Sequence, residues 1–229
     1  MTITSSPPVT AIPRRAARLA IAAVIAYQAL LIALIFIRPD LDPSWHTISE
    51  WAIGPHGWIM VLAFLLSALS YGSLFVTIRS QIRGLWGKAG LGLLLICAIG
   101  TAGVGVFVTD PMPLTPAKGL TTTGLLHVIC GGSALMFLPF AALLVNLSLA
   151  LKNPAWKPAR RALLWTAGLP LLGLAGFVVH LGLVVMPMGE EAYGPGVPLG
   201  WPPRLVFLSY MVWIVTLAAQ AIRVRRQQD

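Results

Sequence analysis

The sequence predicts an all-α membrane protein, a bundle of six transmembrane helices with both termini in the cytoplasm. Three observations lead to this fold class. Of the 229 residues, 57% are hydrophobic and only 10% are charged, whereas soluble domains carry about 25% charged residues. The apolar residues fall into six long runs, and the basic residues cluster in alternate gaps between the runs.

Each of the six runs is long enough to cross a hydrocarbon core of about 30 Å, which takes about 20 helical residues. In chain order the predicted spans are Leu19–Ile37, Trp58–Ile78, Ala89–Thr109, Thr123–Ala150, Ala162–Pro187 and Leu205–Ile222. The fourth and fifth runs exceed the required length, so we expect them to tilt, kink or extend beyond the lipid. Pro170 predicts a kink in the fifth, because proline lacks the N–H that a helix interior uses.

The distribution of basic residues predicts the orientation. Thirteen of the 16 Lys and Arg residues fall on one side, with only Arg38, Lys118 and Arg204 on the other. Basic residues accumulate in short cytoplasmic loops, which places both termini in the cytoplasm. The predicted organisation is a disordered cytoplasmic tail (1–17), a six-helix transmembrane domain (18–222) and a basic cytoplasmic C-terminus (223–229).

Composition also argues against two other classes of protein. The net charge of +9 is not arranged as a basic stripe interleaved with aromatics, so we expect no nucleic-acid partner. The two cysteines, Cys97 and Cys130, cannot form a disulfide framework. Their predicted heights in the bilayer differ by roughly 8 Å, so both are expected to be free thiols.

Reactive side chains gather on the predicted outer face. All the acids except Asp229, and all four histidines, lie in outer loops or in the outer parts of the spans. These residues are Asp40, Asp42, Glu50, Asp110, Glu190, Glu191, His46, His56, His127 and His180. A functional site is therefore expected at this face.

Asp110, His127 and His180 are the candidate catalytic residues. Asp110 follows an outward-running helix, where the helix dipole disfavours a carboxylate, so it needs Lys118, Arg204 or a protonated His127 as partner, or else caps the following turn. His127 and His180 lie roughly 5 and 10 Å below the outer surface. Ionisable groups at such depth are functional candidates, although a neutral interhelical hydrogen bond is the structural alternative. We predict that Asp110 and His127 converge in one outer pocket, near His180 and Arg204.

The stretch HTISEWAIGPHGW, residues 46–58, predicts a short helix at the outer surface. Thr47 and Glu50 match a capping box, and Gly54-Pro55 should end the turn. Trp51 and Ile53 would then face lipid. Alternatively, the helix folds back over the bundle and lowers His46 or Glu50 toward Asp110 and His127.

Other residues are expected to be structural. The glycines of the third span, Gly90, Gly92, Gly100, Gly103 and Gly105, predict a close-packing helix surface. Five aromatic residues fall near predicted interfaces and are interpreted as belt residues. They are Trp156, Trp201, Trp213, Tyr193 and Tyr210.

Four segments in this order resemble the membrane family called domain of unknown function 998. They are HTISEWAIGPHGWIMVLAFLLSALSYG, GVGVFVTDP, TTTGLLHVICGG and GWPPRLVFLSYMVWIV, and the likeness runs from about residue 19 to 222. Its signatures here are Ser49, Glu50, Gly54, Pro55, Gly57, Trp58, Phe107, Asp110, His127 and Arg204. The resemblance implies a six-helix protein of the bacterial cytoplasmic (inner) membrane, and it implies no activity or cofactor.

Four functions remain open from the sequence. The first is an accessory protein that binds a lipid or other amphiphile in an outer-leaflet pocket, with Ser49, Glu50, Lys118 and Arg204 as ligand-binding candidates. The second is an intramembrane enzyme in the same pocket, a hydrolase or lipid-modifying enzyme. It would use His127 as a base oriented by Asp110, or a metal held by His46, His127, His180 and Asp110. A b-type haem protein with His127 and His180 as axial ligands, and a transporter, are the remaining two.

Overall fold

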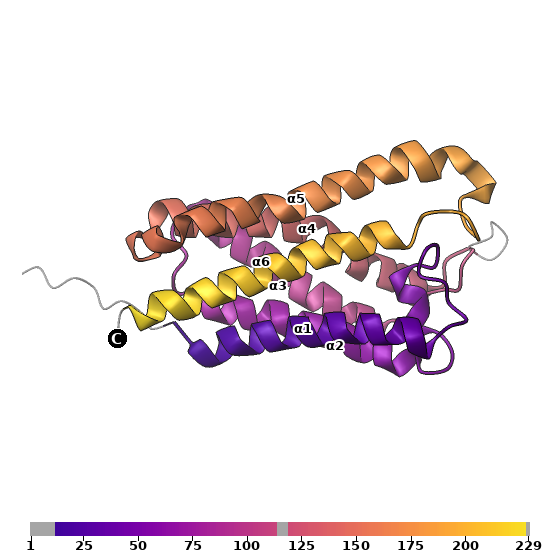
Figure 1. Cartoon of the computed structure of the whole chain (residues 1–229), viewed down its shortest axis with the longest axis horizontal. Helices are drawn as coiled ribbons and strands as arrows, with labels where there is room; N and C mark the ends of the chain where they lie inside the picture. The colour runs from indigo at the N-terminus through magenta and orange to yellow at the C-terminus, as the bar shows by residue number, and fades with distance from the viewer. Residues whose placement is uncertain (1–11, 114–118, 228–229) are drawn as a thin grey trace, which may run out of the picture.

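Six long helices make up almost all of the regular structure. The computed structural model describes residues 12–113 and 119–227, and within them every regular element is a helix. The long helices are α1 (Arg14–Ile37), α2 (Gly57–Ile78), α3 (Gly84–Val106), α4 (Thr122–Lys152), α5 (Arg160–His180) and α6 (Trp201–Arg226). All six, α5 with its flanking short helices, are long and apolar enough to cross a membrane, which confirms the predicted fold class (Figure 1).

The helices form a closed bundle. Each long helix packs against its neighbours in the chain, and α6 closes the ring against α1. The described chain begins and ends at the same end of the bundle (Figure 1). We call this the terminal end, and the opposite end, where the α1–α2, α3–α4 and α5–α6 connections lie, the distal end. That the distal end faces the outside remains a prediction from the basic residues.

Several helices begin or end away from the predicted boundaries. Helix α1 begins at Arg14, so residues 14–17, assigned above to the tail, are helical; residues 1–11 lie outside the described chain. Helix α3 is displaced toward the terminal end and stops at Val106, where Phe107 becomes extended. Helix α6 begins at Trp201 rather than Leu205, because Pro202 and Pro203 fit a first helical turn that needs no N–H donors.

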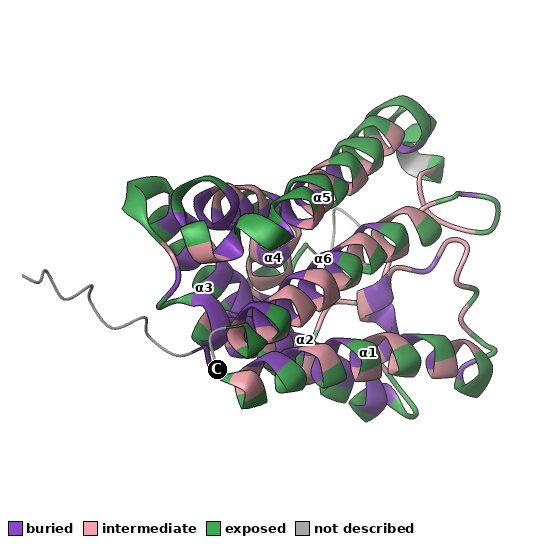
Figure 2. Cartoon of the chain, turned by 60° about the vertical axis from the view of Figure 1, so that its left-hand side comes forward, coloured by how far each residue is buried: buried purple, intermediate pink, exposed green. Residues whose placement is uncertain are grey.

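Helix α5 is the most peripheral of the six. Only 17% of its apolar window is buried, against 33–50% in the other spans, and its distal part is mostly exposed in Figure 2. Pro170 lies inside α5, and the helix continues on both sides of it. The helix continues beyond His180 as one π-helical stretch (Leu181–Val185) and a 3-10 helix (Met186–Glu191). The fifth span therefore ends in short helical turns, and its extension beyond the lipid stays a prediction from its length.

Close packing of α3 against α4 depends on glycines. A Cβ at Gly100 would lie 2.1 Å from Ser133 Oγ, and one at Gly103 would lie 2.6 Å from Cys130 Sγ. A Cβ at Gly92 would meet nothing within 4 Å. The predicted packing surface therefore exists, but Gly92 is not part of it. Cys97 and Cys130 are free thiols, as predicted.

Aromatic residues predicted as interfacial fill the core instead. Trp156 and Trp213 have no exposed surface and Tyr210 is 1% exposed, so the belt interpretation is wrong for these three. Asn146 explains part of this burial, because its Oδ1 accepts a hydrogen bond from Trp213 Nε1 at 3.1 Å. The Asn146 amide also donates to the carbonyl of Leu163 at 2.7 Å, which links α4, α5 and α6 in the terminal half.

Candidate functional site

The connection between α1 and α2, residues 38–56, folds back over the distal end of the bundle; we call it the distal segment. It contains the short 3-10 helix η1 (Ile48–Ala52). The predicted capping box is present, with Glu50 Oε2 accepting the Thr47 N–H at 2.7 Å. Trp51, expected to face lipid, is 1% exposed. This expectation is wrong because η1 packs on α2 and the ring lies beneath the guanidinium of Arg204, at 4.9 Å.

Arg38 holds the later part of the distal segment. Its Nη1 donates to the carbonyls of Ile53 and Pro55, each at 2.8 Å. Its Nη2 forms an ion pair with Asp40 at 2.7 Å. Hydrogen bonding from Arg38 lowers the pKa of the exposed Asp40 carboxyl. One of the few distal cations is therefore used to position the backbone that leads into α2.

Arg204, in the first turn of α6, holds the earlier part. Its Nη1 donates to the carbonyls of Pro43, His46 and Gly200 at 3.2, 3.1 and 2.7 Å. Its guanidinium also lies 5.9 Å from the ring of Trp201. The second terminal nitrogen, Nη2, is buried and has no hydrogen-bond partner. Arg204 therefore keeps its Nη2, which carries two N–H donors, without an acceptor.

His127 is buried in α4 and is hydrogen-bonded at both ring nitrogens. Its Nδ1 lies 2.8 Å from the Phe107 carbonyl and its Nε2 lies 2.8 Å from Ser49 Oγ. The side chain is 4% exposed. The distal segment does fold back toward His127, as the alternative interpretation of residues 46–58 has it. It lowers Ser49 to the imidazole, however, and not His46 or Glu50.

Among the described residues, the hydrogen-bond partner of Asp110 is not one of those predicted. Its carboxylate accepts the Thr121 N–H at 2.9 Å and the Thr121 hydroxyl at 2.7 Å. Gly124 permits this approach, since a Cβ there would overlap Asp110 Oδ2. Within the described residues, no hydrogen bond or ion pair joins Asp110 to His127. Asp110 instead organises the first turn of α4 through Thr121, so the predicted convergence of the two side chains stays a prediction without a direct hydrogen bond between them.

The remaining candidates are dispersed. His180 Nε2 donates to the carbonyl of Pro198 at 2.8 Å. His46 stacks on Trp45, with ring centroids 3.5 Å apart, and its Nδ1 lies 3.1 Å from the carbonyl of Asp42. No group of three His, Cys, Asp or Glu side chains suited to a metal occurs in the part of the chain that the structure describes. Lys118 falls outside that part.

Glu50 also has a hydrogen-bond partner, Tyr193, that the sequence analysis did not predict. The hydroxyl of Tyr193, in the α5–α6 connection, donates to Glu50 Oε1. Burial, reinforced by the hydrogen bond and by the negative charge of Glu50, raises the pKa of the Tyr193 hydroxyl. This contact fastens the α5–α6 connection to the distal segment.

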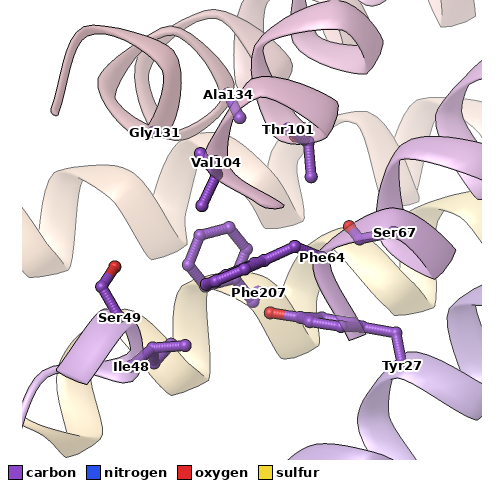
Figure 3. Close-up of a pocket in the computed structure, with 10 residues that line it drawn as sticks. All are labelled: Tyr27, Ile48, Ser49, Phe64, Ser67, Thr101, Val104, Gly131, Ala134 and Phe207. Atoms are coloured by element: carbon purple, nitrogen blue, oxygen red, sulfur yellow. The ribbon is translucent and has the colours of Figure 1, made fainter. Parts of the chain in front are cut away.

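A small cavity of about 70 Å³ lies beneath the distal segment. Its walls include Ser49 from η1, Tyr27, Ser67 and Thr101 from three helices, and the rings of Phe64 and Phe207 (Figure 3). Tyr27 presents its hydroxyl toward the two phenylalanine rings. The hydroxyl of Thr101 is buried and has no hydrogen-bond partner. The cavity is therefore mainly apolar, with a few polar groups directed from its walls, as is usual for ligand pockets.

A groove of about 180 Å³ runs between α1 and α6 on the flank of the bundle. Its apolar walls are Leu31, Ile32, Ile35, Leu205 and Leu208, and its polar residues are Trp201, Arg204 and Gln28. Ile32 and Leu205 are 58% and 61% exposed, so the groove opens on the surface that would contact lipid. The Nε2 of Gln28, like the Nη2 of Arg204, is buried without a partner.

Sequence reasoning missed Tyr27, Gln28, Thr101 and Tyr193. Gln28 and Thr101 did carry a signal, because polar side chains inside apolar spans usually need a partner. Tyr193 carried none, since its role depends on how the α5–α6 connection folds. The carbonyl of Phe107 could not be predicted either, because a backbone group has no sequence signature.

One comparison with known proteins gives a match. A family model described as "Protein of unknown function (DUF998)" matches residues 20–220. No curated protein and no solved structure matches the chain.

Proposed function

This chain belongs to the DUF998 family of proteins of unknown function, and from that premise we propose that it binds a membrane amphiphile with an anionic head group in the α1/α6 groove. In the predicted orientation the groove lies in the outer leaflet of the bacterial cytoplasmic membrane. The ligand is a lipid or lipid-like molecule, and the protein acts as an accessory binding protein.

The observation that carries the proposal is that Arg204, which lines a lipid-facing groove, has a buried Nη2 without a hydrogen-bond partner. A buried donor without an acceptor costs about 1–3 kcal/mol, more when it is charged. No carboxylate forms an ion pair with Arg204 in the described residues; Glu50 attracts it electrostatically but is hydrogen-bonded to Thr47 and Tyr193. A small rotation of the guanidinium would present Nη2 to an oxygen entering the groove. A phosphate or carboxylate oxygen would then form a charge-assisted hydrogen bond.

The shape of the groove favours an amphiphile over a free anion. Its apolar walls match an acyl chain, and Trp201, which is 47% exposed, stands where aromatic residues of membrane proteins meet head groups. Gln28 lies nine residues before the end of α1, roughly 13 Å below that end, so it can hydrogen-bond a carbonyl deeper in the ligand. Arginine inside a membrane span is costly and is usually functional.

Filling the groove tests the proposal without removing Arg204, which also supports the fold. Ile32→Trp places a bulky side chain in the groove, and Ile25→Trp is the matched control, since Ile25 lies on the same helix, is 50% exposed and does not line the groove. Binding of phosphatidylglycerol and phosphatidylcholine to purified protein is measured by native mass spectrometry. We expect Ile32→Trp to weaken phosphatidylglycerol binding about tenfold, equivalent to 1.4 kcal/mol, and Ile25→Trp to leave it unchanged. Equal binding by wild type and both variants would rule out the groove as the site.

A further inference from the structure

The contact between His127 and the Phe107 carbonyl fixes the tautomer of the neutral imidazole. A carbonyl oxygen only accepts hydrogen bonds, so the short contact of Nδ1 with Phe107 requires a proton on Nδ1. In the neutral ring Nε2 then carries a lone pair, and the hydroxyl of Ser49 must donate to it across 2.8 Å. This is the arrangement in which a histidine can remove the proton of a serine, with the histidine oriented by a third group.

The structural alternative is a simple link between η1 and α4, which in a membrane contributes about 0.6–2 kcal/mol. A second observation sets Ser49 apart from such a link, because it also lines the cavity of about 70 Å³. The opposite wall carries Thr101, which is 6% exposed and whose hydroxyl has no partner (Figure 3). A donor without an acceptor, in a cavity that also holds a base-linked hydroxyl, points to a ligand with an acceptor oxygen.

We infer that Ser49 is a nucleophile activated by His127, and that the cavity takes the short acyl group of an ester. The cavity exceeds the roughly 10–15 Å³ that one water needs in such a measure, yet it is far smaller than the 300–1,000 Å³ of drug-sized sites. It suits an acetyl-sized group. Phe64 and Phe207 would contact the methyl end of that group, and Thr101 or Tyr27 would donate a hydrogen bond to its carbonyl oxygen.

The reaction balances with water as the only co-reactant. Ser49 Oγ attacks the ester carbonyl carbon while its proton moves to His127 Nε2, and a C–O bond forms. His127 returns the proton to the departing alcohol oxygen as the original C–O bond breaks, which leaves an acyl-serine. Water attacks this acyl-serine, giving its proton to Nε2. The proton then passes to Ser49 Oγ as the carboxylic acid leaves. This activity is separate from lipid binding in the α1/α6 groove.

Methanesulfonyl fluoride, whose reactive group is close to acetyl in size, tests the inference directly. Purified full-length protein in detergent is treated with the reagent, and the modified residue is located by peptide mass spectrometry. We expect sulfonylation of Ser49 in the wild type and its loss in Ser49→Ala. Ser44→Ala is the matched control, because Ser44 lies in the same distal segment and its hydroxyl contacts neither His127 nor the cavity. Its labelling should equal that of the wild type.

His127→Gln separates activation from mere accessibility. General-base catalysis contributes about 10²–10⁴-fold, so the labelling rate at Ser49 should fall at least a hundredfold in His127→Gln that still elutes as folded protein. The inference is overturned if wild-type Ser49 is not modified while a serine hydrolase in the same micelles is. It is also overturned if folded His127→Gln is labelled at the wild-type rate, because the pair is then only structural.

Discussion

The terminal and distal halves of the bundle differ in how far their buried polar groups are hydrogen-bonded. In the terminal half the buried amides are paired: Asn146 links Trp213 to Leu163, and Asn153 donates to the Gln81 carbonyl at 2.9 Å. The hydroxyl of Ser70 is an exception there, because it is buried without a partner. In the distal half, Trp51 Nε1, Thr101 Oγ1 and Arg204 Nη2 are buried without partners, and a cavity and a groove lie beside two of them. Buried polar groups are normally hydrogen-bonded, so this larger number of exceptions in the distal half needs an explanation. We therefore interpret the terminal half mainly as a scaffold, and both proposals above place the candidate ligand sites in the distal half.

Removing a paired group from the scaffold should have the largest effect on stability. Asn146→Ala leaves the Trp213 N–H without its acceptor in a site with no exposed surface. We expect a loss of about 2 kcal/mol in the free energy of unfolding, because an orphaned buried donor costs about 1–3 kcal/mol. The free energy of unfolding of wild type and variant is measured in mixed detergent–lipid micelles. A loss below a few tenths of a kcal/mol would contradict a tightly paired terminal half.

Tyr193 should contribute less, and in a pH-dependent way. Tyr193→Phe removes the hydrogen bond to Glu50, so we expect a loss of about 1 kcal/mol near neutral pH. The folded protein raises the pKa of Tyr193 above its unfolded value of about 10. The stabilisation is therefore complete below pH 10 and declines as pH rises further, because only the unfolded chain then ionises. The free energy of unfolding of the wild type and of Tyr193→Phe is measured at pH 8 and pH 11, and the difference between the two proteins should be smaller at pH 11. An equal difference at both pH values would mean that the pKa of Tyr193 is not raised by folding.

The smallest effect should come from an unpaired distal group. Thr101→Val keeps the shape of the side chain and removes a buried hydroxyl that has no partner. We expect stability to change by less than about 0.5 kcal/mol or to increase, since no hydrogen bond is lost. A loss of unfolding free energy as large as that of Asn146→Ala would show that the Thr101 hydroxyl is hydrogen-bonded. The proposed difference between the two halves would then be wrong.

The sequence predicts the scaffold well and the site only in part. The six apolar runs identify all six helices, because only an apolar segment with an internally hydrogen-bonded backbone is stable in lipid. The apolar character of a span does not reveal whether a given side chain faces the lipid or the protein core. Lipid and protein core are equally apolar, so Trp156 and Trp213 in the core could not be told from belt residues.

The distal site depends on contacts between parts of the chain that are far apart. Ser49 and His127 are 78 residues apart, and Glu50 and Tyr193 are 143 apart. His127 and Arg204 do contact the distal segment, which contains Glu50, as their position on the predicted outer face suggests. The hydrogen bonds of Asp110 to Thr121 were not predicted, because the helix dipole indicates that the carboxylate needs a partner but does not identify it. Thr121, eleven residues onward, is close enough in the chain to reach it first.

The most direct test compares one cation from each half. A second groove, at the terminal end, is lined by Arg83 and Lys152, so Lys152→Gln serves as the counterpart of Arg204→Gln. Each variant and the wild type are equilibrated with equal amounts of phosphatidylglycerol and phosphatidylcholine, and the bound lipid is quantified by native mass spectrometry. The account predicts that wild type and Lys152→Gln prefer phosphatidylglycerol and that Arg204→Gln loses this preference while remaining folded. Loss of the preference in Lys152→Gln, with Arg204→Gln unaffected, would place anionic-lipid binding at the terminal end and contradict it.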